Sequence, residues 1–163
     1  MNKMNPVYRA GGNDKIYTPI WAAKDMVDHF KPSGNILEPC KGTGVFTDIL
    51  NCNWCEIEEG KDFFDYTDKV DWVISNPPYS VMRKFILHSF TIADNIVYLI
   101  PVWKIFNAFG LIKSGHEYGG IKEIRWYGTG GKLGFPMGNA IGAVHWQRNY
   151  SGPIHETFYG DTA

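Results

Sequence analysis

Residues 36–46, ILEPCKGTGVF, decide the fold class of this chain. The apolar start predicts a short buried strand over about 35–39, residues 42–44 predict a tight turn, and a helix is expected over about 44–51. Glycine tolerates positive φ and lets the backbone approach a ligand closely, while the first turn of a helix offers free N–H donors. The third spaced glycine of the dinucleotide fingerprint is missing. The stretch therefore predicts an α/β fold with a ligand-binding turn after its first strand.

Asn76-Pro77-Pro78-Tyr79 is the second informative motif, and it follows the apolar run 72–74. Two adjacent prolines cannot extend a strand without losing backbone hydrogen bonds, so they predict a stiff loop where a buried strand ends. Open α/β sheets bind their ligands at that edge. The Asn76 amide oxygen and the Pro77 carbonyl can accept both protons of an NH₂ group, and the Tyr79 ring can stack on a flat molecule. Taken alone, the motif would favour a proline turn capped by asparagine, which is common.

Strands and helices alternate along most of the chain, which predicts a Rossmann-like, doubly wound, mostly parallel sheet in a three-layer α/β fold. The last two strands lack a helix between them and predict an antiparallel hairpin. Only residues 58–60 separate the second strand from the extended piece 61–64, and a parallel neighbour needs a dozen or more residues of connection. The sheet is therefore expected to lose a member there. Helices are predicted over 19–30 and 80–92, a helix or loop over 102–114, and further strands over 54–57, 71–75, 95–100, 121–127 and 140–147.

The 163 residues predict a single domain over 1–163, with a loose arm at 1–14 and an irregular tail at 151–163. The sequence has no run of about 18 apolar residues, so no membrane span is expected. The first residues lack a signal-peptide core. Three cysteines without a secretion signal favour a reducing cytoplasm. Cys52 and Cys55 have the spacing of metal ligands, but zinc needs about four and no second pair follows, so no metal is expected.

The two motifs resemble motifs I and IV of the S-adenosylmethionine-dependent amino-methyltransferases, above all the N6-adenine DNA methyltransferases. Tyr17-Thr18-Pro19, followed by an apolar helix, resembles motif X of that family. The order of the three motifs is that of the group in which the cofactor region precedes the catalytic region. The chain has little length for a separate target-recognition domain and in this respect is similar to compact phage enzymes. A short loop, a second copy in a homodimer or a separate specificity subunit would then have to select the site.

The resemblance implies S-adenosyl-L-methionine as the cofactor. Glu56 would accept the ribose hydroxyls, with Glu58 as the nearby alternative, and Asp62 and Phe63 would hold the cofactor adenine. Glu38 stands beside the glycine turn, where its carboxylate could hold an ammonium group. The cofactor-binding residues implied in this way are Tyr17, Thr18, Pro19, Glu38, Pro39, Cys40, Gly42, Gly44, Glu56, Asp62, Phe63 and Asn76.

The resemblance also implies that Asn76, Pro77, Pro78 and Tyr79 form the catalytic loop for methyl transfer to the adenine N6 of DNA. Tyr79 would stack on the target base, and Phe135 lies near the position of a second ring.

Charge is unevenly divided along the chain. Residues 1–75 hold 8 Lys/Arg against 12 Asp/Glu, whereas residues 76–163 hold 8 against 5. Basic residues interleaved with rings suit phosphates and bases, so 102–118, including Lys104, is the expected region of target contact. An ordinary solvated face with core aromatics fits nearly as well. Three other functions stay open: an RNA adenine methyltransferase, a protein glutamine methyltransferase, and a cofactor-binding subunit without catalysis.

Overall fold

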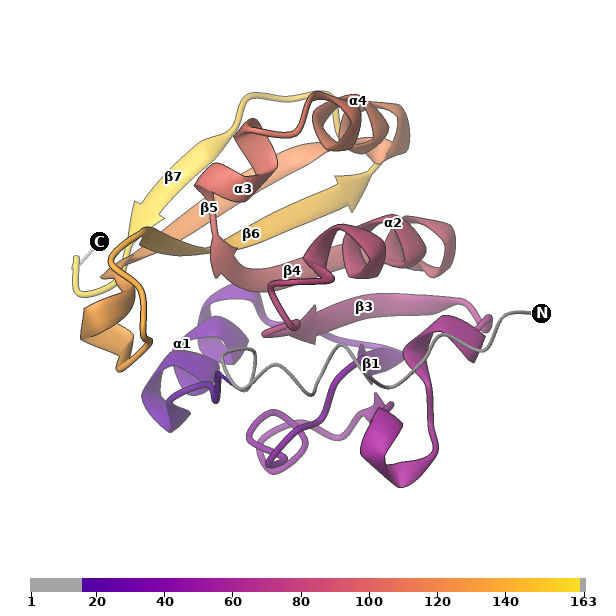
Figure 1. Cartoon of the computed structure of the whole chain (residues 1–163). Coiled ribbons are helices and arrows are strands. Elements are labelled where there is room, and N and C mark those ends of the chain that lie inside the picture. The colour runs from indigo at the N-terminus through magenta and orange to yellow at the C-terminus, as the bar shows by residue number, and fades with distance from the viewer. Residues whose placement is uncertain (1–15, 162–163) are drawn as a thin grey trace.

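The computed structural model describes residues 16–161, and these contain a seven-stranded sheet (Figure 1). The strands are β1 (Ile36–Glu38), β2 (Asn53–Trp54), β3 (Val70–Ser75), β4 (Ala93–Pro101), β5 (Gly119–Thr129), β6 (Ala140–Arg148) and β7 (His155–Phe158). Their order across the sheet is β2-β1-β3-β4-β6-β5-β7. Only β6 runs antiparallel to its neighbours, β4 and β5, and the other pairs are parallel. The predicted mostly parallel sheet with a C-terminal antiparallel hairpin is confirmed.

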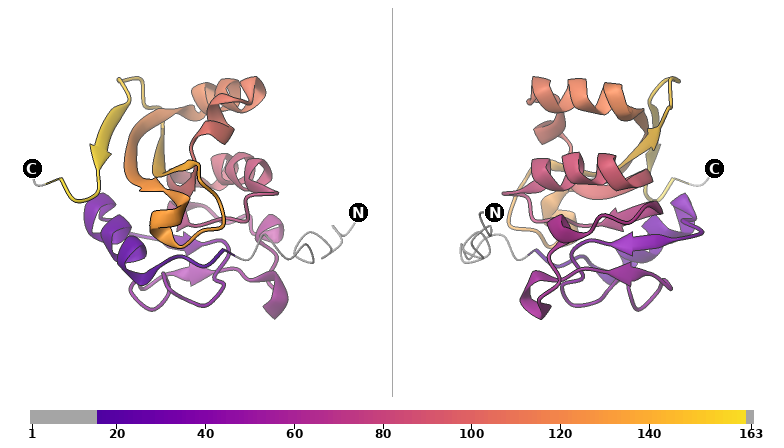
Figure 2. Two further views of the ribbon diagram at one scale, coloured as in Figure 1. Left: turned by 60° about the vertical axis from the view of Figure 1, so that its left-hand side comes forward. Right: turned by 90° about the vertical axis from the view of Figure 1, so that its right-hand side faces the viewer.

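Helices cover both faces of the sheet, which gives the three predicted layers (Figure 2). Helix α1 (Ile20–Phe30) packs through Ala22, Ala23 and Met26 on one face. Helices α2 (Met82–Ile92), α3 (Trp103–Phe106) and α4 (Phe109–Tyr118) cover the other. No helix between residues 16 and 161 is long and apolar enough to cross a membrane.

The prediction of a helix over 44–51 is wrong, because this segment forms consecutive turns. Gly44 has a φ of 90°, and the Asp48 N–H and the Thr47 hydroxyl both donate to its carbonyl. A side-chain donor that competes for a backbone carbonyl weakens helix propagation. The chain must also reach β2 within a few residues, so no regular helix develops.

The strand predicted over 54–57 is only partly present, since β2 ends at Trp54. Two short 3₁₀ helices follow, η2 (Ile57–Glu59) and η3 (Phe63–Asp65). The side chain of Glu56 accepts the Glu58 N–H and that of Asp62 accepts the Phe64 N–H, and such caps start helices rather than extend strands. The expected loss of a sheet member at 61–64 is therefore confirmed.

The tail is not irregular throughout, because β7 adds a strand parallel to β5. Glu123 pairs with His155 and Trp126 with Phe158, and the Tyr159 N–H donates to the Trp126 carbonyl at 2.8 Å. The four-residue strand has little pattern of its own and depends on its neighbour. A further 3₁₀ helix, η4 (Gly130–Leu133), links β5 to β6. The predicted arm at 1–14 lies outside the described residues.

Candidate active site

The glycine turn and the Asn76 loop meet because β1 and β3 are parallel neighbours. Ile36 pairs with Trp72 and Leu37 with Val73, so both strands end at the same edge of the sheet. Directly beyond that edge the Cys40 thiol lies 3.0 Å from the Ser75 hydroxyl and 3.4 Å from the Asn76 carbonyl oxygen. The structure thus brings together the two motifs that lie over thirty residues apart in the sequence.

A cavity of about 150 Å³ separates the two loops. A smaller hollow of about 40 Å³ adjoins it and extends beneath Thr18 and beside Glu38. The two share part of their walls, so they form one site with a shallow and a deep part. Of the predicted residues, those that line one or both are Tyr17, Thr18, Glu38, Cys40, Gly42, Glu56, Glu58, Asn76, Pro77 and Pro78.

Glu56 closes the cavity on the side of the glycine turn. Its side chain is buried and accepts hydrogen bonds from the Gly42 N–H at 2.8 Å and the Glu58 N–H at 3.2 Å. Glu56 also lines the cavity, where a carboxylate can accept hydrogen bonds from the hydroxyl groups of a ligand.

Glu38 lies at the bottom of the deeper hollow and is almost completely buried. The Ser75 hydroxyl donates to it, and so does the Cys40 N–H at 3.0 Å. The pKa of Glu38 is raised to about 7, mainly by burial and in small part by nearby Glu56, against the lowering effect of these hydrogen bonds. A cationic group in the hollow would favour the ionised form.

The side chain of Asn76 is held in one orientation, and its amide oxygen has no hydrogen-bond partner among the described residues. Its Nδ2 donates to the Ile16 carbonyl at 3.2 Å, which identifies the other end of the amide as the oxygen. That oxygen, Oδ1, is buried and has no hydrogen-bond partner among residues 16–161. Leaving a buried acceptor unpaired costs about 1–3 kcal/mol. The site is therefore arranged to receive a hydrogen-bond donor that does not belong to residues 16–161.

Tyr79 and Phe135 lie side by side close to the Asn76 loop. Both rings are buried, and their centroids are 6.5 Å apart with the planes tilted at 70°. The Lys104 ammonium donates to the Tyr79 carbonyl at 3.3 Å. The three residues predicted to contact the target thus come from three separate segments.

Asp62 and Phe63 lie apart from the cavity. Phe63 lies in the core beneath α2, stacked on Phe85 at 5.0 Å, and Asp62 caps η3. Neither lines the cavity, and their contacts with a cofactor adenine stay a prediction.

The remaining predicted residues act through the backbone or lie apart from the site. Pro19 precedes α1, and Pro39 and Gly44 shape the loop around the cavity without lining it. Burial raises the pKa of the Cys52 and Cys55 thiols to about 11. Sequence reasoning missed Ser75, although its place directly before Asn76 at the end of a buried strand was a usable signal.

No protein-family model matches the sequence, and comparison with curated proteins also finds no match. Solved structures do match. A proposed class I S-adenosylmethionine-dependent methyltransferase from Listeria monocytogenes is similar with a TM-score of 0.65 at 12% identity, over 92% of this chain and 67% of that one. A modification subunit of a proposed type I restriction enzyme from Vibrio vulnificus has a TM-score of 0.61 at 14% identity, over 90% and 46%. A proposed RNA methyltransferase from Pyrococcus horikoshii has a TM-score of 0.55 at 18% identity, over 82% of this chain and 81% of that one.

These likenesses establish the class of fold. The chain has the Rossmann-like fold of the class I methyltransferases, with seven strands in the part that the structure describes. At these identities the likeness concerns the fold alone. The chain spans less than half the length of the Vibrio vulnificus subunit.

Proposed function

We propose that this chain is an S-adenosylmethionine-dependent methyltransferase that modifies the N6 amino group of adenine in DNA. The observation that carries the proposal is the buried Asn76 Oδ1, an acceptor with no partner among the described residues. It stands in the wall of a cavity that the glycine turn and Glu56 complete. The class I fold supports the choice of cofactor.

The side chains around the cavity suit this cofactor. S-adenosylmethionine supplies a methyl group on a positively charged sulfur, and it also carries an ammonium group. Two buried carboxylates, Glu38 and Glu56, would face a cationic ligand of this kind, and buried charges are tolerated when they are paired. Glu56 would accept the ribose hydroxyls and Glu38 the ammonium group. The cavity is smaller than the 300 Å³ or so of typical ligand pockets, so the exposed Tyr17 at its rim is expected to move on binding.

Asn76 and Pro77 would activate the adenine amino group. Its nitrogen is a poor nucleophile because the lone pair is delocalised into the ring. When Asn76 Oδ1 and the Pro77 carbonyl accept its two N–H protons, they favour a pyramidal nitrogen whose lone pair is localised and directed at the methyl group. The same two acceptors stabilise the positive charge that develops on the nitrogen. Asn76 is not a general base, since an amide does not take up a proton at neutral pH.

Tyr79 and Phe135 would hold the target base between them. A base in a duplex must leave the stack to reach this position, at a cost of a few kcal/mol. Stacking between two rings offsets part of that cost. The edge-to-face contact of the two rings would be replaced by ring–base–ring stacking after one ring turns.

RNA adenine methylation is the second candidate. The Pyrococcus horikoshii protein is a proposed RNA methyltransferase and matches over most of both chains. The likeness to restriction-modification subunits favours DNA and a partner that selects the sequence.

Transfer of a radiolabelled methyl group tests the proposal. The protein is incubated with labelled S-adenosylmethionine and duplex DNA, single-stranded DNA or RNA, and the product nucleosides are separated. N6-methyladenine in DNA is the expected product, and Asn76→Ala protein is the control. Label in RNA alone would favour the second candidate. No label in any nucleic acid, with cofactor binding intact, would overturn both.

A further inference from the structure

Three exposed rings lie at the edge of the sheet that carries the Asn76 loop. Trp103, Phe106 and Phe109 are 47%, 51% and 80% exposed. They follow directly on β4, whose residue Tyr98 pairs in parallel with Ser75, next to Asn76. Exposed apolar residues that gather on one part of a surface mark binding sites, whereas singly exposed ones are common.

The three rings are not displaced core residues. Ile105 of α3 and Leu111 of α4 already fill the positions that face the sheet, and both are almost completely buried. Trp103 and Phe106 are three residues apart and so lie on neighbouring positions of the same helical turn. The sequence thus places rings on the solvent side of α3 and α4 while aliphatic residues make the core.

Basic side chains accompany the rings. Lys104 lies between two of them in the sequence, and its ammonium group contacts the backbone of the Asn76 loop at the Tyr79 carbonyl. Arg83 of α2 lies over Gly110, where an added Cβ would come within 3.1 Å of its guanidinium group. Residues 102–118 hold Lys104 and Lys113 against a single acid, Glu117. Positive charge beside exposed rings complements a strand of nucleic acid.

We propose that Trp103, Phe106 and Phe109 form a stacking platform for unpaired bases of the DNA strand whose adenine lies at Asn76. The identity of that adenine rests on the proposed function. Ring faces stack on any base and contribute about 1–3 kcal/mol each, while nearby cations follow the phosphates. Helix α3 has only four residues and is too short to serve as a recognition helix in a groove of duplex DNA. The enzyme therefore takes single-stranded or locally opened DNA and discriminates weakly among flanking sequences.

Binding without turnover tests the platform. Fluorescence anisotropy measures the affinity for a labelled single-stranded DNA, the duplex of the same sequence and the matching RNA, at several salt concentrations and without cofactor. Phe109→Ser and Trp103→Ser are each expected to weaken single-stranded DNA binding about tenfold without changing the salt dependence. Arg83→Gln is expected to lower the salt slope by about 0.7, the value for one phosphate contact on a single strand.

Tyr159→Ser is the matched control. This ring is 47% exposed and packs on Trp21 of α1, on the other face of the sheet. Its replacement should leave the affinity unchanged. Circular dichroism verifies that each variant is folded.

The proposal is overturned if both platform variants bind single-stranded DNA like the wild type, or if duplex DNA binds more tightly. Tighter binding of RNA would overturn the assignment to DNA. Loss of self-association, without any loss of DNA affinity, would assign the rings to a protein contact instead. If the platform variants lose DNA affinity but no methyl transfer is found, the platform stands and the proposed function falls.

Discussion

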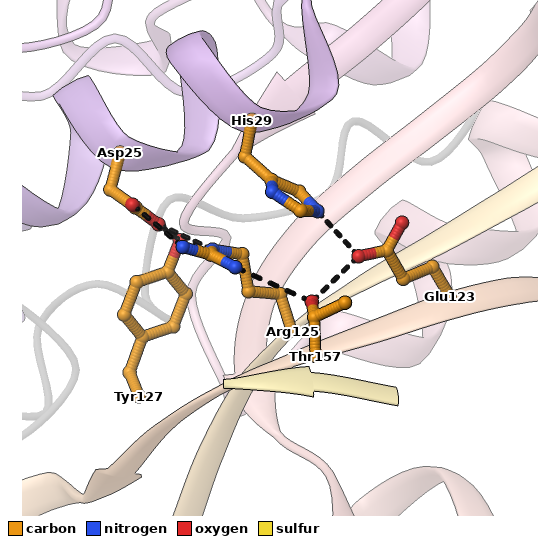
Figure 3. Close-up of polar contacts among 6 residues, drawn as sticks. All are labelled: Asp25, His29, Glu123, Arg125, Tyr127 and Thr157. Atoms are coloured by element: carbon orange, nitrogen blue, oxygen red, sulfur yellow. Dashed lines mark hydrogen bonds and ion pairs between the residues drawn. The ribbon is translucent and has the colours of Figure 1, made fainter. Parts of the chain in front are cut away.

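Asp25 in α1 and Arg125 in β5, a hundred residues apart, form a two-pronged ion pair (Figure 3). Nε of Arg125 lies 2.6 Å from Oδ2 of Asp25, and Nη2 lies 2.9 Å from Oδ1. The Tyr127 hydroxyl donates to the same carboxylate at 2.6 Å. Burial raises the pKa of Asp25, but the hydrogen bonds from Arg125 and Tyr127 outweigh it and leave the pKa below its ordinary value.

A second group of contacts extends this pair to β7. The Thr157 hydroxyl donates to Glu123 at 2.7 Å and lies 3.4 Å from a nitrogen of Arg125, while His29 of α1 contacts the same Glu123 oxygen (Figure 3). The network therefore joins α1, β5 and β7. Because α1 begins directly after the cavity residues Tyr17 and Thr18, the network also fixes one wall of the candidate site.

Removal of Arg125 should destabilise the fold. Arg125→Met leaves Asp25 largely buried without its counter-ion, and we expect a loss of about 2–3 kcal/mol in the free energy of unfolding, measured by urea denaturation. Lys113→Met breaks an exposed pair with Glu117 and should cost less than about 1 kcal/mol. The double variant Asp25→Asn/Arg125→Met should recover part of the loss. If Arg125→Met and Lys113→Met lowered the free energy of unfolding equally, the stabilising role assigned to Arg125 would be contradicted.

Glu38 should make the stability depend on pH. Its pKa rises from 4.5 to about 7 on folding, so the folded state holds an extra proton between these values. Stability should therefore fall as pH rises through that window, by up to about 3 kcal/mol, and the loss should be complete above it. Urea denaturation at about pH 5 and about pH 8 measures this, and Glu38→Gln should remove most of the difference. An unchanged pH dependence in Glu38→Gln would show that other groups cause it.

Asn76→Ala should abolish methyl transfer and spare cofactor binding. The change removes the acceptor proposed for the adenine amino group, and we expect at least a hundredfold or so loss in kcat. Cofactor affinity, measured by calorimetry, should change little. Asn53→Ala is the matched control, since Asn53 is exposed on the edge strand β2, where its side chain contacts Asn35 and Tyr66 and does not line the cavity. Near-normal turnover by Asn76→Ala would remove the proposed catalytic role.

Glu56→Gln should weaken cofactor binding about tenfold, because one of the two acceptor oxygens proposed for the ribose becomes a donor. Glu58→Gln tests the alternative residue, which lines the same cavity. Glu59→Gln changes a carboxylate that pairs with Lys41 and serves as the control. A larger loss in Glu58→Gln than in Glu56→Gln would reverse the assignment.

Several expectations failed where a contact with a distant residue decides the structure. Phe63 and Phe64 are chemically identical neighbours and both contact Phe85 and His88, yet only Phe63 is almost completely buried in the core. The segment after Gly44 has helix-compatible residues, yet the Thr47 hydroxyl and the nearby start of β2 limit it to turns. Strand β7 forms because β5 offers an open edge, which no pattern within 151–161 announces.

Apart from the segment 44–57 and strand β7, the sequence by itself determined the order of strands and helices, the antiparallel hairpin and the meeting of the glycine turn with Asn76. These depend on short-range patterns, on proline and glycine stereochemistry, and on the rule that parallel strands end at one edge. Only the tertiary structure decided that Asn76 Oδ1 is left without a partner within residues 16–161, that Glu38 is buried enough to raise its pKa to about 7, and that Asp25 meets Arg125. Burial and pairing are properties of the packed chain, because they depend on which distant side chains exclude water from each group.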